Sequence, residues 1–363
     1  MSFLEVSMQK KLKKFKLDIT FQARKGCLGI LGASGCGKSM TLRAIAGIVS
    51  PDCGKIVYQG GEIEKRIFFD SHKCINMAPQ KRRTGYLFQN YALFPNMTVA
   101  QNIAAGLAGE WMDKNKEKEQ IRRFLHLFQL ESLKKLYPLQ LSGGQQQRAA
   151  LARMLISRPE ILLFDEPFAA LDSYLKEGLR MELLKILKDS NGISILVTHD
   201  RDEAFQLCDQ ILVLDRGNVI DYGDTKEVFC HPKTEMSARV TGCKNISRIK
   251  RINSHTFCAL DWDEIILHTD ELIEDNITFA GVRAHSFRQC SAQDARRLQK
   301  RGEANLIPVS DAAVSEMPFE WYVTLKNHLW WKIEKKVSGS MEKKEMPPWL
   351  YLPPQEILLL RDN

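Results

Sequence analysis

The stretch that decides the fold is CLGILGASGCGKSMTLRAIAGI, residues Cys27–Ile48. The apolar run at its start predicts a buried strand, and the run after Ser39 predicts a helix. Between them lies the pattern G-x-x-x-x-G-K-[ST], in which glycines let backbone N–H groups wrap phosphates at the amino end of a helix. The sequence therefore predicts a phosphate loop after a strand of an α/β sheet.

Each position of the loop has an expected role toward ATP and Mg²⁺. The Lys38 ammonium reaches the β- and γ-phosphates, and the Ser39 hydroxyl ligates the magnesium ion. Cys36 is expected to contribute its backbone rather than a catalytic thiol. The predicted nucleotide-binding residues are Gly32, Ala33, Ser34, Gly35, Cys36, Gly37, Lys38 and Ser39.

The rest of the first two-thirds alternates short β-branched runs with helical stretches. RRTGYLF, ILLFDEP, SILVTHD and QILVLDRG all have the character of buried strands. This rhythm predicts a mainly parallel sheet with ligands at the strand carboxyl ends. Between Pro95 and Pro138 the spacing of Ile121, Phe124, Leu125 and Phe128 becomes helical, which predicts a helical insertion over about residues 95–155.

Two adjacent carboxylates end the apolar run Ile161–Phe164. A buried strand would deliver both to the cleft that the phosphate loop faces. We expect Asp165 to hold magnesium, directly or through water, and Glu166 to act as the general base on the attacking water. Ordinary surface charge is the alternative for an acidic pair seen alone.

The octet Leu141–Arg148, LSGGQQQR, offers a second anion site, because a serine hydroxyl and glycine backbone open a helix there. It resembles the signature motif of ABC ATPases. The resemblance implies that Ser142, Gly143, Gly144 and Gln145 of one subunit close on the γ-phosphate held by another. It therefore implies ATP hydrolysis by a head-to-tail homodimer that sandwiches two ATP molecules.

Three further positions match that family one by one. Gln89 resembles the Q-loop glutamine that senses the γ-phosphate and magnesium and links to the permease. Asp172, in the segment Ala170-Leu171-Asp172, resembles the D-loop aspartate, and His199 resembles the switch histidine. The family's adenine-stacking aromatic has no clear counterpart, because position 13 is lysine and Phe15 is the nearest candidate; adenine stacking stays unassigned.

The sequence pattern changes in the last third, where short strand-like runs replace long helical periods after His231 and Pro232. Trp321 and Val323 alternate with Tyr322 and Thr324, as a half-buried strand requires. We expect two domains. Residues 1–235 form the ABC ATPase domain, and residues 236–363 form a small all-β domain of the oligonucleotide-fold (MOP/TOBE) type with a regulatory or dimerisation role.

Composition restricts the class of protein further. Of 363 residues, 44% are hydrophobic and 26% are charged, and nine scattered cysteines form no CxxC pair. These values predict a globular protein of a reducing cytosol without a zinc site, a secretory signal or a membrane span. The net charge of +8 does not lead us to predict a nucleic-acid partner, because the densest basic run, Lys10–Lys16, is expected on a solvated edge strand.

The resemblance narrows to bacterial importers of the molybdate and sulfate type. FQNYALFP at 88–95 and the appended β-domain resemble bacterial importers, and TGCKNIS at 241–247 and GVRAH at 281–285 resemble the molybdate or tungstate subgroup. The expected partners are permease subunits at the cytoplasmic face of the cell membrane and, indirectly, an extracytoplasmic binding protein. Sulfate, thiosulfate or another solute is the alternative cargo, and a soluble ABC ATPase acting on ribosomes or DNA is the alternative of another class.

Overall fold

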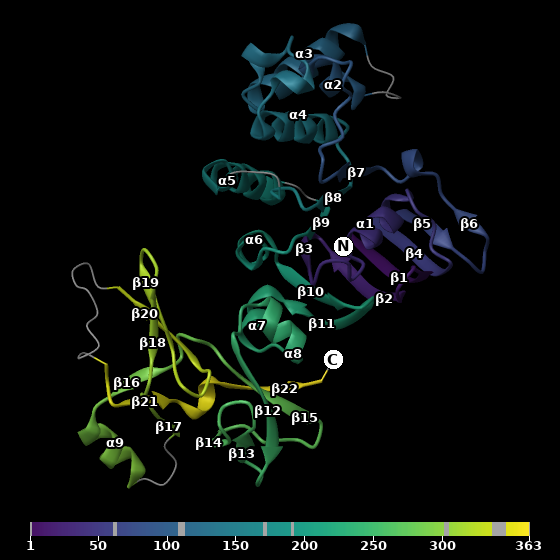
Figure 1. Ribbon diagram of the computed structural model, residues 1–363. Coiled ribbons are helices and arrows are strands. Elements are labelled where there is room, and N and C mark those ends of the chain that lie inside the picture. Colours follow the sequence, from purple (N-terminus) through teal and green to yellow (C-terminus); the bar gives the residue numbers. More distant parts are fainter. Residues whose placement is uncertain are drawn as a thin grey trace. The chain divides into compact units, whose positions relative to one another are not determined.

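Two units make up the chain in the computed structural model, Met1–Lys226 and Glu227–Asn363 (Figure 1). The structure describes residues 2–60, 64–107, 113–169, 173–189, 192–300, 305–335 and 346–362. The division falls inside helix α7 (Thr225–Cys230), near the expected domain boundary at residue 235.

An eleven-stranded sheet organises the first unit. Its spatial order is β6 (Ile75–Asn76), β5 (Glu64–Asp70), β4 (Cys53–Gly60), β1 (Phe3–Lys11), β2 (Lys16–Arg24), β11 (Asn218–Asp224), β10 (Gln210–Asp215), β3 (Gly26–Leu31), β9 (Ile193–Val197), β8 (Ile161–Asp165) and β7 (Thr84–Leu87). The five strands from β10 to β7 are parallel, whereas β6, β5, β4, β1 and β2 pair antiparallel. The prediction of a mainly parallel sheet is therefore wrong for one half, where turns too short for a crossover join successive strands.

The lysine run does not lie on an edge strand, as we expected. β1 and β2 pair with each other over their full length, and β1 also pairs with β4. Lys13 and Lys14 occupy the exposed turn between β1 and β2. An antiparallel strand with one solvated face carries lysines on that face wherever it lies in the sheet, so the alternating pattern could not tell an edge strand from an inner one.

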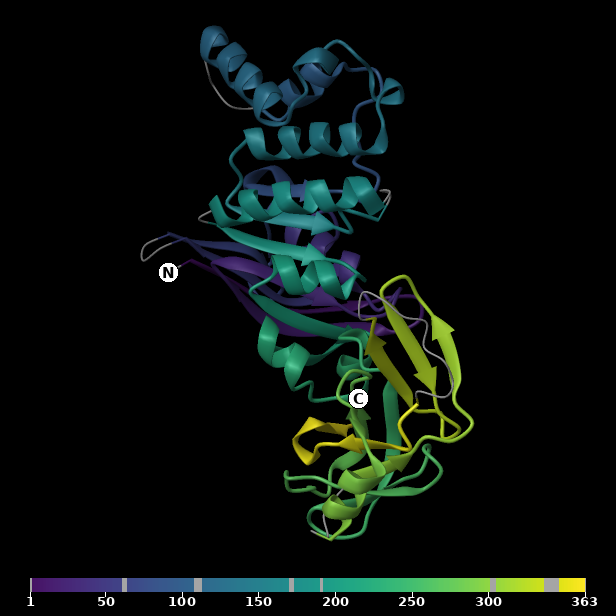
Figure 2. The ribbon, with the colours of Figure 1, turned by 90° about the vertical axis from the view of Figure 1, so that its left-hand side faces the viewer.

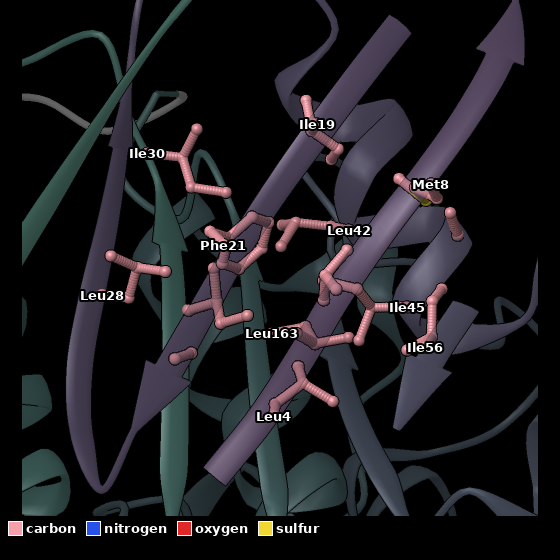
Figure 3. Packing of buried hydrophobic residues seen from close by; sticks show 14 of the residues in the cluster. Leu4, Met8, Ile19, Phe21, Leu28, Ile30, Leu42, Ile45, Ile56 and Leu163 are labelled. Carbon is pink, nitrogen blue, oxygen red and sulfur yellow. The ribbon is translucent and has the colours of Figure 1, made fainter. Parts of the chain in front are cut away.

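The core forms where helix α1 (Lys38–Ala46) packs on this sheet (Figure 3). Leu42 and Ile45 of α1 are fully buried, as are Leu4 and Ile19 of β1 and β2. Burying one such side chain contributes about 1.5–3 kcal/mol. The helix that follows the phosphate loop is therefore fixed against β1 and β2 by apolar contact, which sets the position of the loop.

Arg82 ties the other end of α1 to the sheet although its side chain is fully buried. Its guanidinium donates to the carbonyl oxygens of Ala44 and Ile45 at 2.9 and 2.8 Å and to Met77 O at 2.9 Å. It also lies 5.4 Å from the centre of the Phe68 ring. Desolvation lowers the pKa of Arg82 to about 10, so it stays charged and complements the carboxyl end of the helix.

Arg82→Ala is expected to lower the free energy of unfolding by about 3–5 kcal/mol, because several buried carbonyl groups lose their donor at once. Its neighbour Arg83 supplies the matched control. The Arg83 side chain is 70% exposed and pairs with Glu160 at 3.2 Å, so Arg83→Ala should cost less than about 1 kcal/mol. Urea denaturation of both variants measures the difference, and equal losses would contradict the role given to Arg82.

Helices fill the region of the expected insertion. They are α2 (Val99–Ala105), α3 (Lys114–Leu127) and α4 (Gly143–Ile156), with 3-10 turns at Glu131–Leu133 and Pro138–Gln140. In both ribbon views α4 lies between the α2–α3 pair and α5 (Ser173–Asp189), and α6 (Arg201–Leu207) follows β9 (Figures 1 and 2). The helical insertion is confirmed, with Leu125 and Phe128 buried.

The second unit contains three sheets. The first sheet has the order β14 (Ile265–His268), β13 (Thr256–Ala259), β12 (Asn245–Arg251), β15 (Ile277–Val282) and β22 (Ile357–Arg361). The second has the order β16 (Arg288–Cys290), β21 (Trp349–Leu352) and β17 (Asn305–Pro308). The third has the order β18 (Ala313–Glu316), β19 (Glu320–Thr324) and β20 (Trp330–Glu334). The alternation predicted in β19 is confirmed, since Trp321 and Val323 are buried. An oligonucleotide-fold barrel stays a prediction.

Among the described residues of this unit, helices α8 (Glu235–Val240) and α9 (Ala292–Gln299) depart from the all-β expectation. Ser291 caps α9 by accepting a hydrogen bond from the Asp294 N–H at 3.2 Å. The cap was readable in the sequence, but eight residues give too short a periodic signal. Across the described parts of the chain, no helix has the length and apolar character needed to traverse a membrane.

Candidate active site

Glycine backbone shapes the loop between β3 and α1. Gly32 and Gly37 have φ angles of 151° and 116°, a region in which L side chains are strained. A Cβ at Gly32 would lie 2.1 Å from Leu214 O, and one at Gly37 would lie 2.8 Å from a Leu17 methyl carbon. Gly37 caps α1 without a side-chain bond, so the first N–H groups of the helix remain directed at an anion.

The Lys38 ammonium lies across this loop. It donates to Gly32 O at 2.8 Å and Ala33 O at 2.9 Å, and the residue is 5% exposed. No carboxylate among the described residues forms an ion pair with it. A buried ammonium held only by carbonyl oxygens attracts a multiply charged anion strongly.

Cys36 is buried beside Lys38. Desolvation raises the pKa of its thiol, although the Lys38 charge opposes the rise. A protonated thiol is a poor nucleophile, which agrees with the expectation that Cys36 serves the loop through its backbone.

The Asp165 carboxylate meets the phosphate loop at the end of β8. Its Oδ1 accepts from the Ser39 hydroxyl at 2.6 Å, and its Oδ2 accepts from the Tyr86 hydroxyl at 2.8 Å. A serine hydroxyl and a carboxylate are the hard oxygen ligands that Mg²⁺ prefers.

The same residues agree with an ion that arrives with its nucleotide. Among the described residues no group of three or more His, Cys, Asp or Glu side chains is placed to hold a metal. Magnesium bound through one or two protein oxygens keeps waters and substrate phosphates as its other ligands. The residues present therefore fit a magnesium–nucleotide complex rather than an all-protein metal site.

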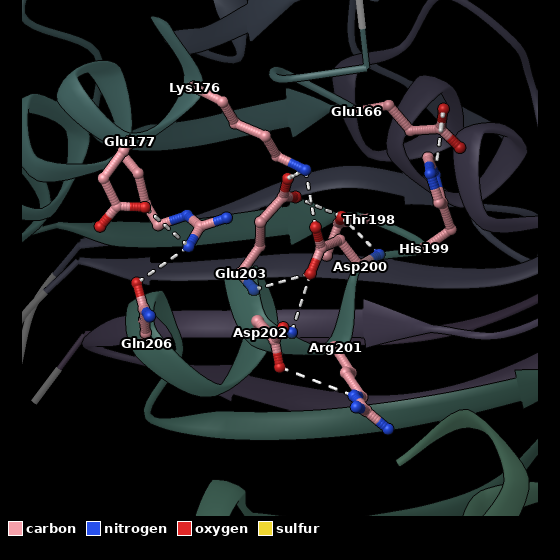
Figure 4. Close-up of polar contacts among 11 residues, drawn as sticks. Glu166, Lys176, Glu177, Thr198, His199, Asp200, Arg201, Asp202, Glu203 and Gln206 are labelled. Carbon is pink, nitrogen blue, oxygen red and sulfur yellow. Dashed lines mark hydrogen bonds and ion pairs between the residues drawn. The ribbon is translucent and has the colours of Figure 1, made fainter. Parts of the chain in front are cut away.

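Glu166 follows Asp165, and its carboxylate lies beside the His199 ring (Figure 4). Gln89 Nε2 donates to Glu166 Oε2 at 3.2 Å, and His199 Nδ1 lies 3.7 Å from the same oxygen. Gln89 follows β7, Glu166 follows β8 and His199 follows β9, and these strands are parallel neighbours. The carboxyl ends of parallel strands meet at one edge of a sheet, and the structure brings these three predicted residues together there.

The backbone at Glu166 is strained. Its φ is 48°, and the conformation is held because the Glu166 N–H donates to Val197 O at 2.9 Å. Left-handed backbone in a residue with a side chain costs of order 1 kcal/mol or more and is concentrated at functional sites. The turn directs the Glu166 side chain toward Gln89 and His199 and away from the strand axis.

A second polar cluster involves Thr198 and Asp200, the two residues that flank His199, and no sequence expectation covered it (Figure 4). Lys176 Nζ lies 2.6 Å from Asp200 Oδ2 and 2.7 Å from the buried Glu203. Burial opposes the charge on Lys176, but its bonds to Asp200 and Glu203 outweigh that effect and raise its pKa. Thr198 also donates to Glu203. The cap pattern Asp200-x-x-Glu203 was the available signal.

Ser142 begins helix α4. Its hydroxyl accepts from Gln145 N at 3.4 Å, while Gln145 Oε1 accepts from Ser142 N at 2.9 Å. Gly143 and Gly144 form the first turn. Within the described residues no hydrogen bond or ion pair joins these four residues to the phosphate loop.

Two sequence expectations remain outside this geometry. Asp172, with Ala170 and Leu171, lies outside the described residues. The Phe15 ring lies against the phosphate loop, with a ring carbon 3.6 Å from the Cβ position of Gly37, and packs at the edge of the core. Adenine stacking therefore stays unassigned.

Arg153 of α4 holds the loop that carries Gln89. Its guanidinium donates to Ala92 O at 2.8 Å and Tyr91 O at 3.0 Å and lies 5.1 Å from the Phe94 ring centre. Asn102 is fully buried and bonds both the N–H and the carbonyl of Phe94, at 2.8 and 3.1 Å. The loop is therefore fixed to α2 and α4, while Phe94 remains 47% exposed.

The arrangement can hold a nucleoside triphosphate with its magnesium and activate a water molecule beside it. Cationic and N–H donors lie on the loop, oxygen ligands lie next to them, and a carboxylate follows with an amide and an imidazole partner. These are the parts that phosphoryl transfer to water requires.

Comparison with known proteins gives consistent matches. The model of the family described as ABC transporter matches residues 16–169. A probable sulfate/thiosulfate import ATP-binding protein of Chlorella vulgaris is 39% identical over 247 residues, 67% of this chain and 100% of that protein. A molybdate/tungstate import ATP-binding protein of Pyrococcus horikoshii is 40% identical over 242 residues, 66% of this chain and 67% of that protein.

A solved structure adds a likeness in fold. The ATP-binding cassette MJ0796, determined as a dimer in a post-hydrolysis state with ADP and Pi, superposes with a TM-score of 0.51 at 28% identity. The match covers 62% of this chain and 99% of that one.

Proposed function

This chain belongs to the ABC transporter family, and from that premise we propose that it is the ATP-hydrolysing subunit of an importer that drives a separate membrane permease. The observation that carries the proposal is the meeting of six side chains at the carboxyl ends of β3, β7, β8 and β9. They are Lys38, Ser39, Gln89, Asp165, Glu166 and His199.

The loop holds the phosphates. The Lys38 ammonium leaves the carbonyl oxygens of its own loop to pair with phosphate oxygens, and the N–H groups at the start of α1 add fixed dipoles. Ser39 and Asp165 supply protein ligands to Mg²⁺, which neutralises developing charge on the phosphates. Nothing in this step requires a covalent intermediate with the protein.

Glu166 supplies the chemistry on water. Its carboxylate accepts the proton as the water attacks, and Gln89 and His199 hold that carboxylate from two sides. His199 is 61% exposed, so it can turn toward a phosphate without disturbing the core. Asp172 is assigned the D-loop role across the dimer.

Hydrolysis then depends on two copies of the chain. Ser142 and Gly144 present a helix amino terminus that their own phosphate loop does not meet, so a partner's γ-phosphate is the natural anion for it. A head-to-tail pair supplies this contact twice and encloses two ATP molecules. The dimeric state of the cassette MJ0796 supports this part of the proposal.

The loop 88–97 is the proposed contact with the permease, at the cytoplasmic face of the membrane. Phe94 and Met97 are 47% and 38% exposed, and Arg153 and Asn102 fix the backbone that carries them. An exposed apolar pair on a rigid loop is suited to a helical partner. The second unit, whose sheets we assign to an oligonucleotide-fold domain, is proposed to regulate or brace the dimer.

An oxyanion is the proposed cargo, delivered by an extracytoplasmic binding protein, and sulfate or thiosulfate has better support than molybdate. Sulfate/thiosulfate importers recur among the relatives, whereas the molybdate/tungstate relative appears beside importers of iron(III) and putrescine. The relatives named here are import proteins, so a ribosome- or DNA-directed ATPase has no support.

Uptake of labelled sulfate, thiosulfate and molybdate by cells that lack the gene tests the proposal. We expect loss of sulfate or thiosulfate uptake, restored by the wild-type chain and not by Lys38→Ala, because the variant loses its phosphate partner. Selective loss of molybdate uptake would return the cargo to molybdate. Rescue by Lys38→Ala would contradict an ATP-driven role.

A further inference from the structure

The Asp165 carboxylate has a second hydroxyl partner that no role described so far uses. Ser39 occupies Oδ1 at 2.6 Å, and Tyr86 occupies Oδ2 at 2.8 Å. The two donors come from different elements, helix α1 and the neighbouring strand β7. The orientation of the carboxylate is therefore determined by two bonds and not by one.

The sheet itself delivers the Tyr86 hydroxyl. β7 and β8 are parallel, and Tyr86 stands opposite Leu163, two residues before Asp165. The Tyr86 ring packs against Phe88, with ring centroids 4.4 Å apart. Apolar packing thus holds the ring, and the hydroxyl alone reaches the carboxylate.

The Tyr86 hydroxyl is the donor in this pair, because a carboxylate oxygen can only accept. The bond is a neutral hydroxyl donating to a carboxylate, a charge-assisted hydrogen bond.

The two hydroxyls are not equivalent toward a metal. A serine that ligates Mg²⁺ presents an oxygen lone pair to the ion, so the position of its oxygen is then set by the ion as well as by Asp165. The Tyr86 hydroxyl has no proposed part in binding the ion, so it can hold the carboxylate with the same bond whether or not the ion is present.

We propose that Tyr86 is a positioning residue for magnesium: its hydroxyl fixes Asp165 in the orientation that accepts the ion, directly or through water. The inference rests on the proposed function, because it concerns the same nucleotide site. It separates the ring, which packs, from the hydroxyl, which orients, so Tyr86→Phe isolates the second role.

The test compares nucleotide binding with and without the ion. A fluorescent, non-hydrolysable ATP analogue is titrated onto the full-length chain in EDTA and then at increasing Mg²⁺. For Tyr86→Phe we expect affinity in EDTA within twofold of wild type and a Mg²⁺ requirement for half-maximal tightening raised about tenfold, since one charge-assisted hydrogen bond is lost. Mn²⁺ titration followed by electron paramagnetic resonance gives a second readout of the ion alone.

Tyr222→Phe is the matched control. Its hydroxyl donates to Gln22 O at 2.7 Å in the same unit, its ring is likewise partly buried, and it has no part in the nucleotide site. It should leave both titrations unchanged. An unchanged Mg²⁺ requirement in Tyr86→Phe would overturn the inference. A loss of affinity in EDTA as large as the loss in Mg²⁺ would also overturn it, because the bond would then have only a structural role. Absence of nucleotide binding by the wild-type chain would instead refute the proposed function.

Discussion

Glu166→Gln is expected to reduce ATP turnover severely while ATP still binds. The amide keeps the size and the hydrogen bonds of the carboxylate but cannot accept the proton of the attacking water. Loss of a general base reduces kcat by about 10²–10⁴-fold. Steady-state phosphate release measures the loss, and size-exclusion chromatography with Mg-ATP should reveal an accumulated dimer.

Glu177→Gln is the control for this experiment. Glu177 is a 64%-exposed carboxylate that pairs with Arg180 at 3.3 Å on α5, so it shares the chemistry of the change and not the site. It should retain the wild-type rate. A Glu166→Gln protein that hydrolyses ATP as fast as Glu177→Gln would remove Glu166 from the mechanism.

Ser142→Arg is expected to lose hydrolysis by about 10²-fold or more, because it removes a phosphate contact and places a bulky group at the helix end. Each monomer should still bind ATP, since the phosphate loop is untouched. Loss of the cap should cost only about 1 kcal/mol of stability. Phosphate release and equilibrium ATP binding on the same sample separate these effects.

Mixing two defective chains tests the trans arrangement directly. A pair made of Ser142→Arg and Lys38→Ala has one site with an intact loop and an intact partner serine, so at most one of its two sites can work. Activity above that of either variant alone is expected. Full activity of pure Ser142→Arg would contradict the head-to-tail dimer.

The phosphate loop was predictable because its constraint is local. Gly32 and Gly37 leave no room for a Cβ, and Lys38 follows at a fixed spacing, so one short segment specifies backbone, charge and helix start together. Glu166 was predicted from its place after a buried strand, whereas Gln89 and His199 were identified by resemblance. Their meeting depends on three parallel strand ends, which the alternation of strands and helices indicated only in outline.

What the sequence did not indicate lies in long-range pairing. No local pattern links Tyr86 to a carboxylate 79 positions later, since its alternation along β7 states only which face it takes. Arg82 and Arg83 are equally charged neighbours, yet one is fully buried and the other is mostly exposed. The antiparallel pairs formed by β1, β2, β4, β5 and β6 were missed for the same reason. Alternation shows which face of a strand is buried and does not show which strands lie beside it.

The hydrogen bonds of Arg153 to the loop that carries Phe94 couple that loop to helix α4. Arg153 lies eleven positions after Ser142, about 16 Å along a helix at 1.5 Å per residue. Two carbonyl bonds and a ring contact join Arg153 to the loop that carries Phe94. In the proposed transporter, a displacement of this loop by the permease would therefore be passed through α4 to Ser142, and binding of a phosphate at Ser142 would be passed back to the loop.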